Sequence, residues 1–198
     1  MNNLKYKCLK CGVCCFEIPG DYQKRIPLYP EEVENLIVIA KERNIKFQVI
    51  EDLVFPDILN KKIIVITYKI KLDNENKCCP FYSEEKGCTI QEIKPMACKA
   101  YPLSLKQEDA FHFQISIDPL CNYVLKFYDE LTNINLNQIK AIFDEEYKNA
   151  ELHLKKNKKL ILKIKQLEHL NKIKILREIT IDQFNDYLKK WDRVEIKV

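Results

Sequence analysis

The chain has 198 residues, of which 46% are hydrophobic, and this is enough apolar material for one globular domain or for one domain with a helical extension. No stretch approaches the roughly 18 uninterrupted apolar residues of a membrane span, and residues 1–12, MNNLKYKCLKCG, contain no apolar signal segment, so we expect a cytoplasmic protein without a membrane contact. The formal net charge is +4, and the basic excess lies in residues 150–198, which carry 13 basic and 7 acidic side chains.

The first motif in chain order is CLKCGVCC, which has four cysteines within residues 8–15. A CxxC spacing lets two thiolates converge on one ion across a tight turn, and Gly12 allows backbone N–H groups to point at sulfur. Cys14 and Cys15 are adjacent, and neighbouring side chains of an extended segment point to opposite faces. We therefore expect one ion to use both with difficulty, which favours two sites or a second role for one of the two cysteines.

Residues 29–44, YPEEVENLIVIAKERN, have the pattern of an amphipathic helix of about three turns. Pro30 suits the first helical position, and two acidic residues follow it in the first turn. The side chains expected to face the core are Val33, Leu36, Ile37 and Ala40.

Residues 46–55 and 61–73 are rich in β-branched and aromatic side chains, and the second run alternates apolar with polar positions. This pattern predicts two strands in a hairpin around residues 56–62. Residues 74–104 contain Pro, Gly and Cys without a sustained period and are expected to be loop. Residues 110–118, AFHFQISID, predict a third short strand.

After Leu120 the pattern becomes helical. Residues 135–154 and a second run from Leu160 to Leu170 each have an apolar stripe at helical spacing. Thr180 is the expected N-cap of a last helix over residues 181–191. We expect the inward side chains of that last helix to be Phe184, Leu188 and Trp191.

These elements predict an α+β fold, in which a small antiparallel sheet and irregular, cysteine-rich, metal-tied loops pack on helices and a helical C-terminal portion follows. All nine cysteines lie between positions 8 and 121. The sequence therefore predicts a cysteine-cluster metal-binding domain over residues 1–130, with residues 131–198 as a helical C-terminal extension packed on it.

Nine thiols in a reducing compartment are expected to be free or metal-bound, because cytosolic thiols stay reduced and an odd number cannot pair completely. Besides the first cluster, Cys79, Cys88, Cys98 and Cys121 supply four more thiols. Eight sulfurs form two sets of four, and two kinds of metal centre fit such sets. Structural Cys₄ zinc contributes roughly 10–16 kcal/mol of apparent binding energy, whereas CxxCxxC with a remote cysteine before Pro80 is close to a ferredoxin-type pattern that holds a 4Fe-4S cluster.

The motifs CLKCGVCC, CCPFY and GCTIQEIKPMACKAYPL, together with the later Cys121, resemble the YkgJ-type cysteine-cluster family of zinc- or iron-chelating domains over roughly residues 8–121. The resemblance implies zinc or iron as the cofactor. Members of this family are often labelled iron-sulfur oxidoreductases, and a related cluster occurs in the larger flagellin lysine methylases. Carried over by position, the implied metal ligands are Cys8, Cys11, Cys14, Cys15, Cys79, Cys88, Cys98 and Cys121.

Two classes of function follow from this pattern. In the first, the chain is a metal-binding module that holds zinc or iron for structure, storage or delivery, with the helical tail contacting a protein partner. In the second, it is an iron-sulfur oxidoreductase or protein-modifying enzyme whose cluster is the reactive group. The sequence offers no separate acid, base or nucleophile, which favours the first class.

Several other residues have ordinary structural explanations. Cys78 has no counterpart in the family and is expected to be a non-ligand thiol, and His112 sits in a strand-like run. Phe81, Tyr82 and Tyr101 are expected to pack around the site rather than to react. Residues 155–159, KKNKK, lack interleaved aromatics, so we expect a solvated helix face and no nucleic-acid partner.

Overall fold

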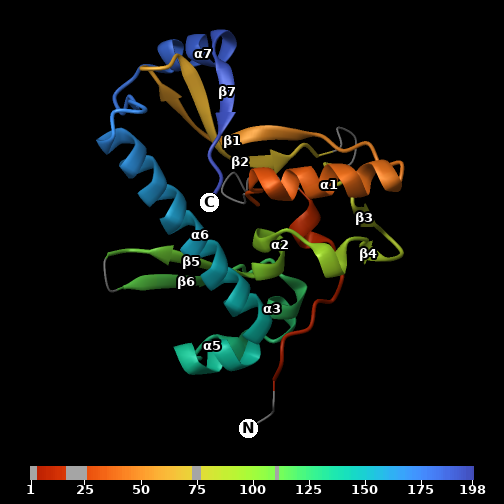
Figure 1. The fold of residues 1–198 in the computed structure, drawn as a ribbon. Coiled ribbons are helices and arrows are strands. Elements are labelled where there is room, and N and C mark those ends of the chain that lie inside the picture. Colours follow the sequence, from red (N-terminus) through yellow and green to blue (C-terminus); the bar gives the residue numbers. More distant parts are fainter. Residues whose placement is uncertain (1–3, 17–25, 73–76, 110–111) are drawn as a thin grey trace. The chain divides into compact units, whose positions relative to one another are not determined.

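The computed structural model describes residues 4–16, 26–72, 77–109 and 112–198. It contains helices and small sheets, followed by a mainly helical C-terminal part, which confirms the α+β class (Figure 1). The chain forms two compact units, each built from two segments of the sequence. Unit 1 comprises residues 1–26 and 72–155, and unit 2 comprises residues 27–71 and 156–198. The expected domain boundary near residue 130 stays a prediction.

Unit 2 is organised around the predicted hairpin. Strands β1 (Val49–Asp57) and β2 (Lys62–Ile70) pair antiparallel, and β7 (Asp192–Glu195) lies parallel on the other side of β2. Residues 63–67 of the central strand β2 are all buried, Thr67 included. The continuous apolar run over residues 63–66 fits a strand that is covered on both faces, and the predicted alternation concerned residues 66–72. Strand β7 was missed because its four residues are all exposed and carry no apolar periodicity.

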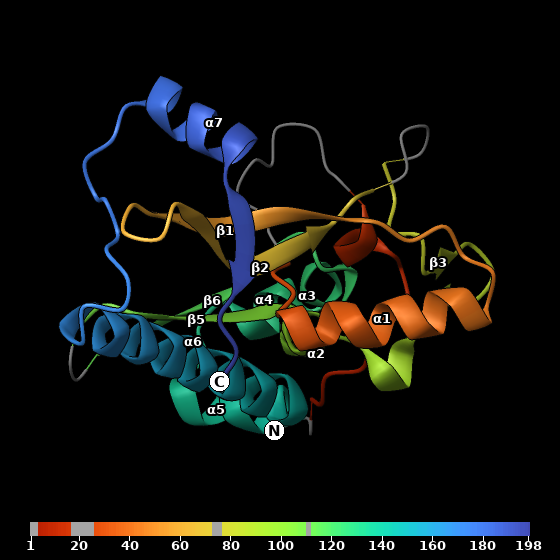
Figure 2. The ribbon, with the colours of Figure 1, turned by 45° about the horizontal axis from the view of Figure 1, so that its top comes forward.

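The first helix of unit 2 begins and ends where the sequence predicts. Helix α1 (Pro30–Glu42) has Pro30 at its first position and contacts β2 (Figure 2). Val33, Leu36 and Ala40 are buried as expected. Ile37 is 38% exposed, so the expectation that it faces the core is wrong: the buried stripe is narrower than the apolar stripe of the sequence.

The last helix, α7 (Ile181–Lys190), is capped by Thr180, whose hydroxyl accepts a hydrogen bond from the Gln183 N–H at 3.2 Å. None of its residues is fully buried, and Phe184 and Leu188 are only partly covered. Trp191 stacks on Tyr187 with ring centroids 4.0 Å apart.

Residues 156–169 of the long helix α6 (Asp144–His169) also belong to unit 2. Leu160 and Ile164 are buried. Lys156, in the basic run, is largely covered: it forms an ion pair with Glu31 and lies 3.9 Å from the centroid of the Tyr29 ring. One member of the expected solvated face is therefore part of the packing of unit 2.

Unit 1 contains two small sheets, of which the first lies within the expected loop over residues 74–104 and includes Cys88. Strands β3 (Tyr82–Ser83) and β4 (Gly87–Cys88) form one sheet. Strands β5 (Leu103–Gln107) and β6 (Phe113–Ile117) form the other. Strand β6 confirms the predicted third strand, although residues 110–111 lie outside the described residues. The short helices η2 (Gln91–Ile93) and α2 (Met96–Ala100) lie between these sheets in the sequence.

The core of unit 1 is formed by helices α3 (Asn122–Lys126), α4 (Tyr128–Leu131), α5 (Leu136–Ile142) and the first part of α6. The Tyr6 ring packs on Tyr123 and Phe143, with centroids 4.9 and 5.2 Å away. The Tyr6 N–H also donates to the Ile142 carbonyl at 2.8 Å. The segment that precedes the first cysteines is thereby fixed to this helical core. Among the described residues, no helix is long and apolar enough to cross a membrane.

The carboxylate of Asp57 joins the hairpin of unit 2 to the segment before α7. Asp57 is 1% exposed and accepts hydrogen bonds from the backbone N–H groups of Leu59 (3.1 Å) and Lys174 (2.9 Å) and from the Asn60 amide (2.5 Å). Removing the carboxylate would leave these donors without their acceptor.

We predict that Asp57→Ala lowers the free energy of unfolding by about 2–4 kcal/mol, measured by urea denaturation with the fluorescence of Trp191, the single tryptophan. Asp192→Ala removes an exposed carboxylate from the same unit and should change that free energy by less than about 0.5 kcal/mol. Equal effects of the two substitutions would contradict the assigned role of Asp57.

Candidate metal centre

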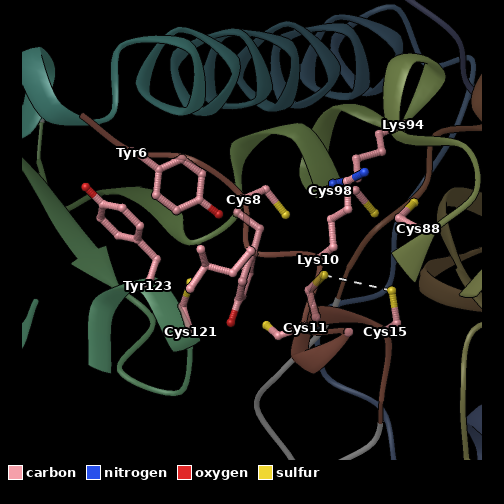
Figure 3. Close-up of a pocket in the computed structure, with 14 residues that line it drawn as sticks. Tyr6, Cys8, Lys10, Cys11, Cys15, Cys88, Lys94, Cys98, Cys121 and Tyr123 are labelled. Atoms are coloured by element: carbon pink, nitrogen blue, oxygen red, sulfur yellow. Dashed lines mark hydrogen bonds between the residues drawn. The ribbon is translucent and has the colours of Figure 1, made fainter. Parts of the chain in front are cut away.

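One cavity in unit 1 is lined by thiols from distant parts of the sequence. They come from the N-terminal segment, from β4, from α2 and from the residue that precedes α3 (Figure 3). All are free thiols. The cavity brings together seven of the eight cysteines implied as ligands: Cys8, Cys11, Cys14, Cys15, Cys88, Cys98 and Cys121.

The N-terminal cysteines follow a tight turn that depends on Gly12. This residue has φ 77° and precedes the 3-10 helix η1 (Val13–Cys15), and its carbonyl accepts a hydrogen bond from the Cys15 N–H at 2.6 Å. A Cβ at Gly12 would lie 2.4 Å from Cε2 of Tyr82. Both the positive φ and the close approach of Tyr82 therefore require glycine here.

The 3-10 turn corrects the expectation for the adjacent cysteines. Cys14 and Cys15 do not lie in an extended segment, and their side chains do not diverge, because the helical turn directs both into the same cavity. Their Sγ atoms are 3.9 Å apart, the contact drawn as a dashed line at Cys15 in Figure 3.

Cys79 adjoins this pair but is not among the lining residues. Its N–H donates to the Cys15 carbonyl at 2.8 Å, and the Cys15 thiol is hydrogen-bonded to the Cys79 sulfur. Although the bond with Cys14 lowers it, the bond with Cys79 and burial together hold the pKa of Cys15 above its ordinary value. Cys78 is buried outside the cavity, with its thiol 3.5 Å from the Cys79 carbonyl; that it is not a ligand stays a prediction.

Cys121 is the N-cap of α3 and lies against Tyr6. Burial raises the pKa of its thiol, and hydrogen bonds from the N–H groups of Val124 and Tyr123 and from the Tyr6 hydroxyl act in the opposite direction. At Cys88, burial likewise raises the pKa, opposed by the Ile90 N–H and by the charge of Lys94. Each of these thiols thus has groups beside it that favour the thiolate, which is the form that binds metal.

Sequence reasoning missed four residues that line the cavity: Tyr6, Leu9, Lys10 and Tyr123. The sequence did contain a signal for the two lysines of the lining, which is their closeness to cysteines. Lys10 lies within the first CxxC, and Lys94 precedes Cys98 by four positions. Tyr101 lines the cavity, as its expected packing role requires.

The structure also shows where Tyr82 and His112 lie. Tyr82 packs edge-on against Phe16, with ring centroids 4.9 Å apart. His112 is exposed and hydrogen-bonded to Asp109, and it is not among the residues that line the cavity.

The donor set of the cavity fits zinc or iron rather than a hard cation. The 14 lining residues include seven cysteines and no Asp, Glu or His, and thiolates select zinc and iron-sulfur centres whereas magnesium and calcium require oxygen ligands. In the part of the chain that the structure describes, no three Cys, His, Asp or Glu side chains already stand close enough to hold one ion. The cavity gathers the donors, and the side chains must still close around a metal.

Comparison with known proteins identifies a family. A family model with the signature CxxCxxCC, described as "Putative zinc- or iron-chelating domain", matches residues 7–122. This range contains all nine cysteines. No curated protein and no solved structure matches the chain.

The turn at Gly12 generates a prediction about the stability of unit 1. Gly12→Ala should lower the free energy of unfolding by about 2 kcal/mol or more, because it adds backbone strain at positive φ and a clash with Tyr82. Urea denaturation of Gly12→Ala, Tyr82→Ala and the double variant measures the coupling of the two sites. The double variant should be more stable than the sum of the single effects implies, and simple additivity would show that the two residues do not touch.

Proposed function

The chain belongs to the CxxCxxCC family of zinc- or iron-chelating domains, and on that premise we propose that it holds zinc or iron as individual ions on the thiolates of this cavity. The observation that carries the proposal is the 3.9 Å separation of the Cys14 and Cys15 sulfurs. The proposed ligands are drawn from Cys8, Cys11, Cys14, Cys15, Cys79, Cys88, Cys98 and Cys121.

The separation of the two sulfurs matches two ligands of one tetrahedral ion. With Zn–S bonds of about 2.3 Å, tetrahedral geometry places two sulfurs on the same ion about 3.8 Å apart. In a 4Fe-4S cluster each cysteine binds a different iron atom, so the cysteine sulfurs stand further apart. The pair formed by Cys14 and Cys15 therefore favours two sulfurs on one metal atom over a 4Fe-4S cluster.

An ion in this cavity would connect the four segments that supply the thiols. These segments are short and irregular, so metal binding would add a large part of their stability. Cys8, Cys11, Cys14 and Cys15 are each partly exposed to solvent, which supports exchange of the ion with the surroundings. This combination suits storage or delivery as well as a structural role.

A reducing, cytoplasmic location and a protein partner for the helical tail are further parts of this proposal. Nine free thiols support the first, because they would oxidise in a secretory compartment. The exposed Leu162 and Ile181 of helices α6 and α7, at 65% and 79% exposure, are compatible with the second.

The composition of the bound centre tests the proposal directly. Protein produced with both zinc and iron in the medium and purified under argon should contain stoichiometric metal, no acid-labile sulfide and no broad absorption near 400 nm. A brown protein with stoichiometric sulfide would overturn the proposal and favour an iron-sulfur oxidoreductase or a protein-modifying enzyme.

We predict that Cys14→Ser and Cys15→Ser each weaken the same metal site, because each removes one sulfur from a shared ion. Titration with cobalt(II) reports this as lower intensity of the sulfur-to-cobalt charge-transfer bands and as weaker binding in competition with a chelator. Cys78→Ser, which alters the buried thiol next to Cys79, is the matched control and should keep the wild-type titration. If either Cys14→Ser or Cys15→Ser left the titration unchanged, the two cysteines would not share an ion.

A further inference from the structure

Two lysines reach into the thiol cavity from different segments of unit 1. Lys10 comes from the first CxxC, and Lys94 comes from the residue after η2. In Figure 3 the two side chains extend toward each other. Both residues line the cavity.

The backbone at Lys10 is held in place by its neighbours. Lys10 has φ 56°, in the left-handed region, and it lies against Gly87, where a Cβ would stand 2.7 Å from the Lys10 Cβ and 2.9 Å from its carbonyl oxygen. Such close contact is possible only because residue 87 is glycine. Lys94 is partly buried and is followed by the buried Pro95, which restricts its backbone. The two ammonium groups therefore enter the cavity from constrained positions.

Among the residues that line the cavity, no carboxylate accompanies the two lysines. Within the described residues neither Lys10 nor Lys94 forms an ion pair, and the lining contains no Asp or Glu. The charge of Lys94 acts on the carboxyl group of Glu146 without a direct contact. Burial is the main cause of the raised pKa of Glu146. Two like charges directed into one cavity repel each other unless anions lie between them.

We infer that Lys10 and Lys94 are the counter-charges of the metal-thiolate centre. The inference rests on the proposed function. Four thiolates around a divalent ion carry a net charge of −2, and the two ammonium groups balance that charge. They act on the ion through the thiolates and do not bind it, so they are positioning residues for the centre.

The consequence is that the lysines favour the fully ligated, anionic form of the centre over partly ligated forms. A lysine that adjoins a cysteine without lining the cavity would not have this effect, because water screens its charge from the thiolates. Lys7 and Lys99 provide this comparison: like Lys10, each is exposed and adjoins a proposed ligand, but neither lines the cavity.

The experiment measures zinc affinity by competition with a chelator, together with zinc stoichiometry at saturation, for wild type and for Lys10→Gln, Lys94→Gln and the double variant. Each single change should weaken zinc binding by about 10–100-fold, as losses around first ligands commonly do. Lys7→Gln and Lys99→Gln should stay within about threefold of wild type at 0.15 M salt. Lys10→Arg and Lys94→Arg should restore most of the affinity, because they keep the charge.

A purely structural role of the lysines would appear in the metal-free protein. The free energy of unfolding of the metal-free Gln variants should equal or exceed that of wild type, since removing one of two repelling charges does not destabilise the cavity. Lys10→Met and Lys94→Met, which keep the aliphatic stem, replace any Gln variant that fails to fold.

The two levels of proposal fail differently. If wild type binds stoichiometric zinc but the Gln variants bind it as tightly as Lys7→Gln and Lys99→Gln do, the counter-charge inference is wrong and the metal site stands. If wild type binds no zinc or iron at saturation, the proposed function fails, and the counter-charge inference fails with it.

Discussion

The thiol cavity depends on close backbone packing at two glycines. Gly12 lies against Tyr82, and Gly87 lies against Lys10, so the N-terminal cysteines are fixed next to the β3–β4 sheet in two places. Neither contact leaves room for a Cβ. Without them, the N-terminal thiols would have no fixed position relative to Cys88, and the cavity would lose the segment that supplies four of its seven cysteines.

The same packing gives the cavity an unusual electrostatic composition. Seven thiols, two lysines and three tyrosines line it, and no carboxylate does. Burial opposes ionisation of the Cys88 and Cys121 thiols by raising their pKa, whereas metal binding requires thiolates. A divalent ion and two ammonium groups both favour the charged form, so the lysines and the metal would act on the thiols in the same direction.

Local patterns predicted most of the secondary structure and failed where burial came from long-range pairing. Helix α1 and the β1–β2 hairpin follow the expected ranges because Pro30 and the β-branched runs act locally. Strand β7 has an exposed, charged sequence and exists through its pairing with β2. The burial of residues 63–67 of β2 also depends on packing with segments that are distant in the chain. Helix α7 shows the opposite case: its sequence is amphipathic, but its apolar residues Phe184 and Leu188 are only partly buried by the elements around them.

The sequence by itself determined the family, through the spacing of its cysteines, and helix caps such as Thr180 marked element ends. The eight ligands that the family resemblance implies stay a prediction. Only the tertiary structure decided that Cys14 and Cys15 face one cavity, that Cys79 stands beside Cys15, and that Lys10 and Lys94 enter the site. The physical reason is that periodicity reports which way a side chain points within its own element. Contacts between residues far apart in the chain depend on how the elements pack, and spacing alone does not contain that information.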